Sequence, residues 1–283
     1  GSIMITAENI FDNFKFTMSG LEKGLQVIHI TTPAAQLLCC QDDEDIETVL
    51  ACDDLKPFDQ IPVKKQETII GLLKRRDCPE GAKGAAGKHM QPLGEKILVS
   101  ADTSLLDFIQ DKESLDRIVI GGTKIYGLVT KSDFLKLPVS LLGFALYTHI
   151  ETLLLHMIRK TVINSEEWLT WIYPPHKKEI ERDFKKLSRE RSEPDKLELS
   201  YFSDKSTILE RLATLEEYAY YVPDKIFIDQ LKEIGELRNT IAHSRKASDN
   251  DDFLQQFIDR LIHAHKWIED IEQWQTTKAH TAP

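Results

Sequence analysis

A repeat at a spacing of 56 residues is the feature that most restricts the fold of this 283-residue chain. The segment Ile61-Pro62-Val63 is followed by Gly71-Leu72-Leu73-Lys74-Arg75-Arg76-Asp77, and the segment Arg117-Ile118-Val119 is followed by Gly127-Leu128-Val129-Thr130-Lys131-Ser132-Asp133. An apolar run and a helical pattern precede each copy. Each copy therefore predicts the order β-α-β-β-α, with a hairpin between its last two strands.

Each copy resembles a CBS domain, whose signature is an apolar strand ending near Pro-Val, a short hairpin, and then Gly-h-x-Thr/Ser-x-x-Asp at the start of a helix. The second copy matches this signature fully, whereas the first has Lys74 in place of the hydroxyl residue and keeps Asp77. The resemblance covers about residues 37–137, and it implies a pseudo-symmetric pair of domains. Such pairs often serve only as dimerisation scaffolds, and this alternative stays open.

The resemblance also implies an adenine nucleotide (ATP, ADP or AMP) as a regulatory ligand. Thr130 would face a phosphate, Asp133 would hold the ribose hydroxyls, and the adenine would lie against the strand residues Val99, Ser100 and Ile118. A carboxylate accepts hydrogen bonds from both hydroxyls of a ribose, and a hydroxyl beside free helix N–H groups suits an anion. In the first copy, Lys74 and Asp77 would provide a second site that is the more easily left empty.

The segment between the copies is rich in glycine, which predicts a flexible loop over 79–95. It is not a P-loop, because Ala82 stands where that motif requires its first glycine and His89 replaces its hydroxyl residue. The expected domains are an N-terminal extension (1–30), a tandem pair (31–138, with repeats at 31–78 and 96–138) and a helical domain (139–283).

The second half of the chain has helical periodicity throughout. After Pro138, apolar residues recur at Leu142, Leu146, Ile150 and Ile158, which predicts a long helix. Further helices are expected at 166–172, 177–191, 207–219, 225–242 and 252–274. The predicted class is therefore α+β, with a tandem β-α-β-β-α pair followed by an all-α bundle.

The helix expected at 225–242 ends with Arg238-Asn239-Thr240-Ile241-Ala242-His243. This segment resembles the Arg-x4-His element of HEPN-superfamily ribonucleases, in the form with asparagine directly after arginine. At 100° per residue, Arg238 falls inside the apolar stripe of the helix, where a guanidinium needs an anion or a structural carboxylate. His243 lies about 140° from Arg238, so we expect a second protomer to complete the site.

The resemblance implies metal-independent RNA cleavage, in which the ribose 2′-OH attacks the adjacent phosphate and leaves a cyclic phosphate end. His243 would act as acid or base, Arg238 would hold the phosphate, and Asn239 would orient the imidazole. No metal constellation is evident in the sequence. A structural role for Arg238 stays open as the alternative.

The formal charge of −10 gives no global attraction for nucleic acid, so any RNA contact must use a local patch. A basic run between Lys177 and Arg191 is a candidate, but Glu179, Glu181 and Asp183 interrupt it, so a solvated, ion-paired face is equally compatible. The cysteines form no CxxC pair, and no membrane span is evident, which favours a cytoplasmic protein.

These observations predict a homodimeric endoribonuclease whose helical domain is controlled by an adenine nucleotide, with a role as a toxin or defence effector. The alternative is a non-catalytic adenine-nucleotide sensor whose helical domain binds a protein or RNA partner.

Overall fold

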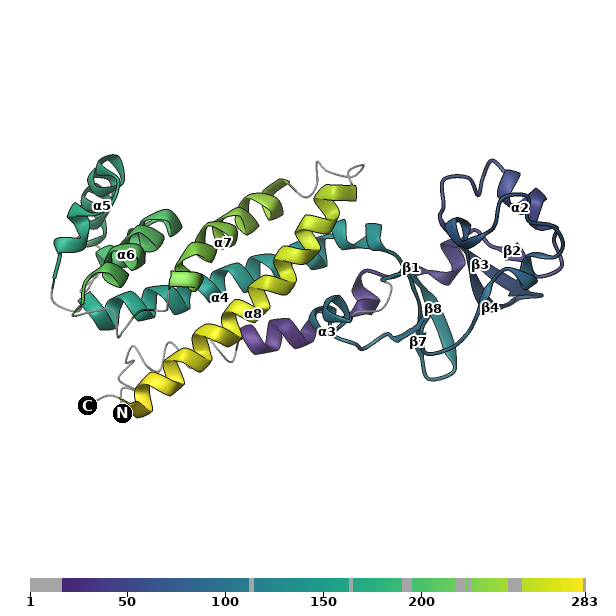
Figure 1. Ribbon diagram of the computed structural model, residues 1–283, viewed down its shortest axis with the longest axis horizontal. Helices are drawn as coiled ribbons and strands as arrows, with labels where there is room; N and C mark the ends of the chain where they lie inside the picture. Colours follow the sequence, from purple (N-terminus) through teal and green to yellow (C-terminus); the bar gives the residue numbers. More distant parts are fainter. Residues whose placement is uncertain are drawn as a thin grey trace. The chain divides into compact units, whose positions relative to one another are not determined.

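The computed structural model describes residues 17–111, 115–162, 165–189, 195–216, 222, 225–243 and 251–281. The chain forms two compact units, one mainly Ser19–Leu142 and the other mainly Gly143–Lys246 with Gln255–Pro283. The first unit combines short strands with short helices, and the second is helical (Figure 1). The α+β class predicted from the sequence is confirmed.

The described part of the first unit contains two four-stranded sheets. Their strands are β1 (Thr32–Pro33), β2 (Cys40–Gln41), β3 (Gln60–Lys65), β4 (Thr68–Lys74), β5 (Gln91–Pro92), β6 (Leu98–Ser100), β7 (Arg117–Gly121) and β8 (Lys124–Val129). One sheet has the order β2-β3-β4-β5, and the other has the order β1-β8-β7-β6.

Within each repeat, the first two strands are parallel and the last two form an antiparallel hairpin. Helix α2 (Ile46–Ala51) connects the parallel strands of the first repeat, and α3 (Leu105–Gln110) connects those of the second. The predicted β-α-β-β order is confirmed. The final helix of each repeat is shorter than expected, because the chain forms only the 3-10 turns η3 (Arg75–Asp77) and η5 (Lys131–Leu135) there.

The outer strand of each sheet comes from the segment before the first parallel strand of the other repeat. Strand β1 precedes β2 of the first repeat but pairs antiparallel with β8 of the second. Strand β5 precedes the second repeat but pairs antiparallel with β4 of the first. The two repeats therefore exchange their outer strands and complete each other's sheets.

The exchange continues in the hydrogen bonds that hold these segments. Val27 N donates to Thr103 O at 2.9 Å, and in the equivalent place Ala86 N donates to Glu44 O at 2.8 Å. The prediction of a flexible loop at 79–95 is therefore wrong. This segment contains the 3-10 turn η4 (Ala86–Lys88) and strand β5, and backbone hydrogen bonds fix it to the first repeat. Likewise, the end of the segment expected as an N-terminal extension forms the turn η1 (Val27–His29) against the second repeat.

The glycines of the repeat signature allow this exchange. A Cβ on Gly127 would lie 2.0 Å from the carbonyl oxygen of Thr32 in β1, and a Cβ on Gly71 would lie 2.5 Å from that of Gln91 in β5. Real side chains do not approach backbone atoms so closely. Only glycine at these two positions lets the crossing strands reach hydrogen-bonding distance.

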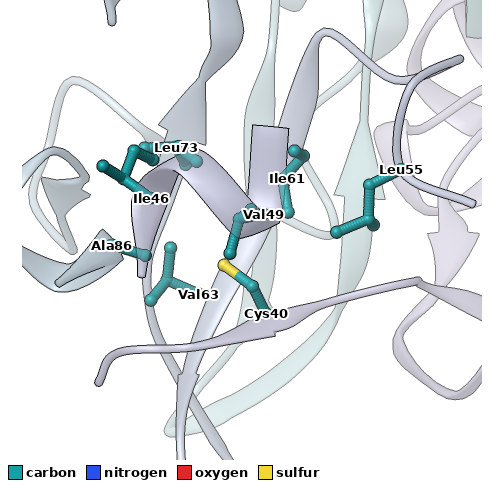
Figure 2. Close-up of a cluster of buried hydrophobic side chains, with 8 residues drawn as sticks. All are labelled: Cys40, Ile46, Val49, Leu55, Ile61, Val63, Leu73 and Ala86. Carbon is teal, nitrogen blue, oxygen red and sulfur yellow. The ribbon is translucent and has the colours of Figure 1, made fainter. Parts of the chain in front are cut away.

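Figure 2 shows the core of the first repeat, in which α2 packs over the sheet. Ile46 and Val49 from α2 contact Ile61 and Val63 from β3, and all four are at most 2% exposed. Ala86 of the crossing segment is buried in the same cluster. The crossing segment is thus part of this hydrophobic core.

Between the repeats, equivalent positions meet. Gln60 Nε2 donates to Asp116 Oδ2 at 2.9 Å, and these residues are one repeat length apart. A second apolar cluster joins β4 and β8 through Leu72 and Leu128, which also correspond between the repeats. The predicted pseudo-symmetry therefore extends to the packing of one repeat against the other.

The second unit contains five long helices within its described residues: α4 (Leu137–Val162), α5 (Pro174–Leu187), α6 (Phe202–Thr214), α7 (Lys225–His243) and α8 (Asp251–Thr281). Helix α4 begins in the first unit and continues into the second. The residues predicted to form its apolar face, Leu142, Leu146, Ile150 and Ile158, are all fully buried.

Two of the predicted helices differ from the structure. The helix expected at 166–172 is only the 3-10 turn η6 (Glu167–Thr170). The helix expected at 207–219 begins earlier, at Phe202, because the Asp204 carboxylate accepts from Tyr201 N at 3.0 Å and caps the first turn.

Helix α4 is the one described helix that is long and apolar enough to cross a membrane. Its apolar window is 61% buried within the protein. Gly143 on this helix lies against Ile241 of α7 and Leu261 of α8, with atoms 3.1 Å from a Cβ built at the glycine. These contacts are those of a helix in the core of a bundle.

We predict that Gly127→Ala destabilises the first unit by about 1–3 kcal/mol, because the new methyl group overlaps the Thr32 carbonyl and displaces β1. Chemical denaturation followed by circular dichroism measures this change. Gly24→Ala is the matched control, because nothing lies within 4 Å of a Cβ at that position in the helical residues 17–24. Equal stability of the two variants would contradict the role assigned to Gly127.

Candidate functional site

Helix α7 carries the Arg-x4-His motif and packs mainly through one face. Phe227, Leu231, Ile234 and Leu237 are buried, as the periodicity predicts. Arg238 is exposed, although its angular position falls inside the apolar stripe. The reason is that the buried face moves around the helix near its end, where Thr240 is 4% exposed.

The inference that burial forces an anion onto Arg238 is therefore wrong. Within the described residues, no carboxylate forms an ion pair with this guanidinium, so the structural pairing that was the alternative is not found there either. An exposed arginine that has no carboxylate partner among the described residues can offer donors to a phosphate.

Thr240, at the centre of the motif, fixes α7 to α8. Its hydroxyl donates to Glu236 O at 2.8 Å and accepts from Arg260 Nη1. Arg260 also lies 3.9 Å from Glu233. The sequence pattern did not identify Arg260, because nothing in the spacing of α8 indicates that it meets the motif. Because these contacts hold α7 against α8, the backbone that carries the exposed residues of the motif is fixed in position.

A buried tyrosine lies within electrostatic range of Arg238. Burial raises the pKa of Tyr147 above its ordinary value, the Glu151 carboxylate raises it further, and the positive charge of Arg238 lowers it. The phenol of Tyr147 is therefore protonated at neutral pH. Tyr147 is only 5% exposed on α4, and sequence reasoning missed it because it reads as one more core aromatic.

The remaining motif residues lie at the end of α7. The side chain of Asn239 is exposed, and its Nδ2 donates to Glu236 Oε2 at 3.5 Å. His243 is the last residue of α7, but its side chain is outside the part of the chain that the structure describes. The predicted contact between Asn239 and the imidazole therefore stays a prediction.

The second repeat places Thr130 and Asp133 together at the end of β8. Asp133 Oδ2 accepts from Thr130 N at 2.7 Å and from its hydroxyl at 3.1 Å. Asp133 Oδ1 lies 2.7 Å from Lys136 Nζ and 3.4 Å from the hydroxyl of Thr32. The carboxylate is 7% exposed, so a ribose must displace one or more of these partners to bind.

Two residues of this cluster come from outside the sequence motif. Thr32 belongs to the crossing strand β1, and Lys136 also donates to Ile30 O at 2.6 Å. Sequence reasoning missed both, because the crossing of β1 to the second repeat was not predicted. The site is therefore assembled from both ends of the first unit.

The first repeat has a different arrangement. Lys74 is 6% exposed at the end of β4, whereas the side chain of Asp77 is 49% exposed and lies 3.7 Å from Arg76 Nε. Lys74 and Asp77 are thus not gathered into a capped cluster like that of Thr130 and Asp133. The Asp77 carboxylate of the first repeat is therefore more exposed than the Asp133 carboxylate of the second.

The strand residues expected to contact adenine differ in how far they are exposed. Ile118 is 1% exposed and packs in the cluster between the repeats, so its side chain is not available to a base, and the adenine contact expected at this strand stays a prediction. Val99 pairs with Val119 and is partly exposed. Ser100 is exposed, and its hydroxyl donates to Asp102 at 2.5 Å. The described residues contain no group of three or more His, Cys, Asp or Glu side chains arranged to hold a metal.

The four cysteines carry free thiols. Burial raises the pKa of Cys40 to about 11, and the neighbouring Glu44 carboxylate raises it as well. This thiol is therefore protonated at neutral pH and is a poor nucleophile, so it belongs to the core and not to a site.

Comparison with known proteins finds similar solved structures but no similar sequence families. No protein-family model matches the chain, and no curated protein matches it significantly. The CBS domain of a bacterial CNNM/CorC family Mg²⁺ transporter in complex with ATP is 22% identical, with a TM-score of 0.34, and covers 43% of this chain and 92% of that chain.

Two further solved structures show the same kind of likeness. CBSX2 in complex with AMP is 17% identical, with a TM-score of 0.35, and covers 42% of this chain and 98% of that chain. The CBS domains of a transcriptional regulator from Streptococcus pneumoniae are 19% identical, with a TM-score of 0.33, and cover 38% of this chain and 95% of that chain. Each of these likenesses covers between 38% and 43% of this chain.

Proposed function

We propose that this protein is a metal-independent endoribonuclease of the HEPN type, controlled by an adenine nucleotide bound to its CBS-like unit. The observation that carries the nuclease proposal is the exposure of Arg238 on a fixed helix, five residues before His243 and without a carboxylate partner in the described residues. Arginine in this state suits the binding of a phosphodiester.

The reaction follows from these two side chains. A base removes the proton of the ribose 2′-OH, the oxygen attacks the adjacent phosphorus, and the bond to the 5′-oxygen breaks with a proton delivered to it. The products are a 2′,3′-cyclic phosphate and a 5′-hydroxyl. A histidine imidazole without a perturbing environment exchanges protons near neutral pH, so His243 can act as the acid or the base, and Arg238 neutralises the phosphate charge as it grows.

The geometry of one helix does not supply both groups to one phosphate. At 100° per residue, Arg238 and His243 are about 140° apart around α7. In a two-fold symmetric dimer, Arg238 of one protomer and His243 of its partner lie on facing surfaces, which resolves the difference. The proposed enzyme is therefore a homodimer with two composite sites.

The nucleotide proposal rests on the cluster at the end of β8. Thr130 and Asp133 stand at the start of η5, where the hydroxyl and backbone N–H groups suit a phosphate and the carboxylate suits a ribose. Lys136, 2.7 Å from Asp133, supplies a positive charge that becomes available when ribose hydroxyls take over the carboxylate. A ligand regulates only if it binds two states of the protein with different affinity.

We predict that Arg238→Ala and His243→Ala each reduce the cleavage of a structured RNA at least about 100-fold, because each removes a group that acts in the transition state. Gel analysis of 5′-labelled RNA in the presence of EDTA measures the rate, and a cyclic phosphate end identifies the chemistry. Lys232→Ala, an exposed residue on the same helix, is the control and should cleave at the wild-type rate. Equal residual cleavage in all variants would exclude the nuclease, and the non-catalytic sensor would then be the better description.

A mixed dimer tests the composite site directly. Co-expression of Arg238→Ala and His243→Ala chains with different affinity tags yields a dimer in which one site has both groups and the other has neither. We predict about half of the wild-type activity for this mixed dimer, although both parent homodimers are inactive. No recovery of activity would mean that each site is contained in one chain.

For the nucleotide site, we predict that Asp133→Asn weakens adenine nucleotide binding about 10- to 100-fold, because a hydrogen bond to a charged acceptor is lost. Titration calorimetry with ATP and AMP measures this change. Asp77→Asn is the matched control in the first repeat, where the carboxylate is exposed, and it should leave the second-repeat site unchanged. Unchanged affinity for Asp133→Asn, in a protein with unaltered circular dichroism, would mean that the ribose contact is misassigned.

A further inference from the structure

Helix α5 presents a row of positive charges along one exposed face. The row consists of Lys178, Arg182, Lys185, Lys186 and Arg189, all of them exposed. Together with Glu181 they line a surface hollow of about 370 Å³. Their spacing of three and four residues places them on one side of the helix over about three turns. The sequence left two interpretations of this face open, an RNA contact and a solvated, ion-paired surface.

The interleaved acids do not neutralise the row. Asp183 pairs with Arg182 at 2.9 Å, and this is the one ion pair that the row forms within the described part of the chain. The Glu179 Oε2 accepts from the Tyr201 hydroxyl at 2.8 Å, and the charge of Glu179 acts on Arg182 without forming an ion pair with the row. Most of the row is therefore solvated and not ion-paired, which leaves its charges available to a ligand.

The opposite face holds α5 firmly in the helical unit. Ile180 is 1% exposed in the core. His176 Nδ1 lies 2.7 Å from Oδ1 of Asp204, whose side chain is 2% exposed, and the rings of His176 and Tyr201 have centroids 4.4 Å apart. The backbone that carries the row is therefore fixed, and only the long basic side chains must be ordered when a ligand binds.

The composition of the face decides which kind of partner it fits. Protein interfaces are depleted in lysine and have an apolar core, whereas the hollow on α5 is lined by charged side chains alone. A helix that binds a membrane surface needs an exposed apolar face, but the apolar Ile180 of α5 is buried. Lysine and arginine without apolar neighbours are the typical contacts to nucleic acid phosphates.

We propose that this face of α5 binds the sugar-phosphate backbone of RNA without reading its sequence. In a chain with a formal charge of −10, a local row of this kind is needed for any polyanion to approach. The inference deepens the proposed function, on which it rests for the identity of the bound RNA as substrate. The proposal gives the protein a set of phosphate contacts on α5 that is separate from Arg238.

The test measures binding without cleavage. A fluorescein-labelled single-stranded RNA is titrated by anisotropy against His243→Ala protein at several salt concentrations, with and without Lys185→Gln and Lys186→Gln together. Each lost phosphate contact should reduce the slope of log K against log salt by about 0.7, so we expect a fall of about 1.4 and weaker binding at low salt. Lys23→Gln with Lys266→Gln, two exposed lysines on other helices, is the matched control and should leave the slope unchanged.

The outcomes separate this inference from the nuclease proposal. An unchanged slope and affinity in the Lys185/Lys186 variant would overturn the α5 proposal while leaving cleavage by Arg238 and His243 intact. RNA bound through α5 but not cleaved by the wild-type protein would overturn the nuclease and keep the RNA-binding face. Displacement of the RNA by a polyglutamate peptide at equal charge concentration would overturn the RNA assignment in favour of an acidic protein.

Discussion

The antiparallel pairing of β1 with β8 and of β5 with β4 is the constraint on which the first unit depends. Each pairing requires a backbone carbonyl to approach the sheet at a position where any side chain would overlap it, and Gly127 and Gly71 provide that space. Because each crossing segment also contributes to the core it reaches, as Ala86 does, neither repeat has a complete sheet or core by itself. The two repeats are therefore expected to fold as one cooperative unit.

In the helical unit, buried polar contacts determine where the candidate residues stand. Arg260 reaches across from α8 to the Thr240 hydroxyl, and this hydrogen bond orients the last turns of α7. Lys205, 3% exposed, bonds to Glu151 at 3.1 Å and to Ser200 O at 2.6 Å, which joins α6 to α4. A buried charge that is paired and hydrogen-bonded in this way is costly to break, so these contacts specify one arrangement of the helices. Arg238 projects from that arrangement to the surface.

The sequence predicted those features that have a local pattern. The 56-residue repeat identified the strands, helices and hairpins of both repeats, and 3.6-residue periodicity identified the buried faces of α4 and α7. It did not predict the crossing strands, because β1 and β5 are two residues long and carry no alternation. Nor did it predict that Arg238 is exposed, because an angular position on an ideal helix does not show where the neighbouring helices end. The contacts of Thr32 with Asp133 and of Arg260 with Thr240 join residues far apart in the chain, which no local pattern reveals.

The position of the Asp133 cluster gives the proposed regulation a physical starting point. Lys136 bridges Asp133 and the carbonyl of Ile30, and the next residue, Leu137, is the first of α4. In the proposed regulation, ribose hydroxyls at the Asp133 carboxylate would compete with Lys136 for it, and a phosphate would offer that lysine a new partner. A bound nucleotide would thus change the hydrogen bonds of the residue directly before the helix whose later residues form the core of the helical unit. Since the free energy of this exchange would depend on both the ligand and the conformation at the start of α4, nucleotide binding and the state of that helix would be thermodynamically linked.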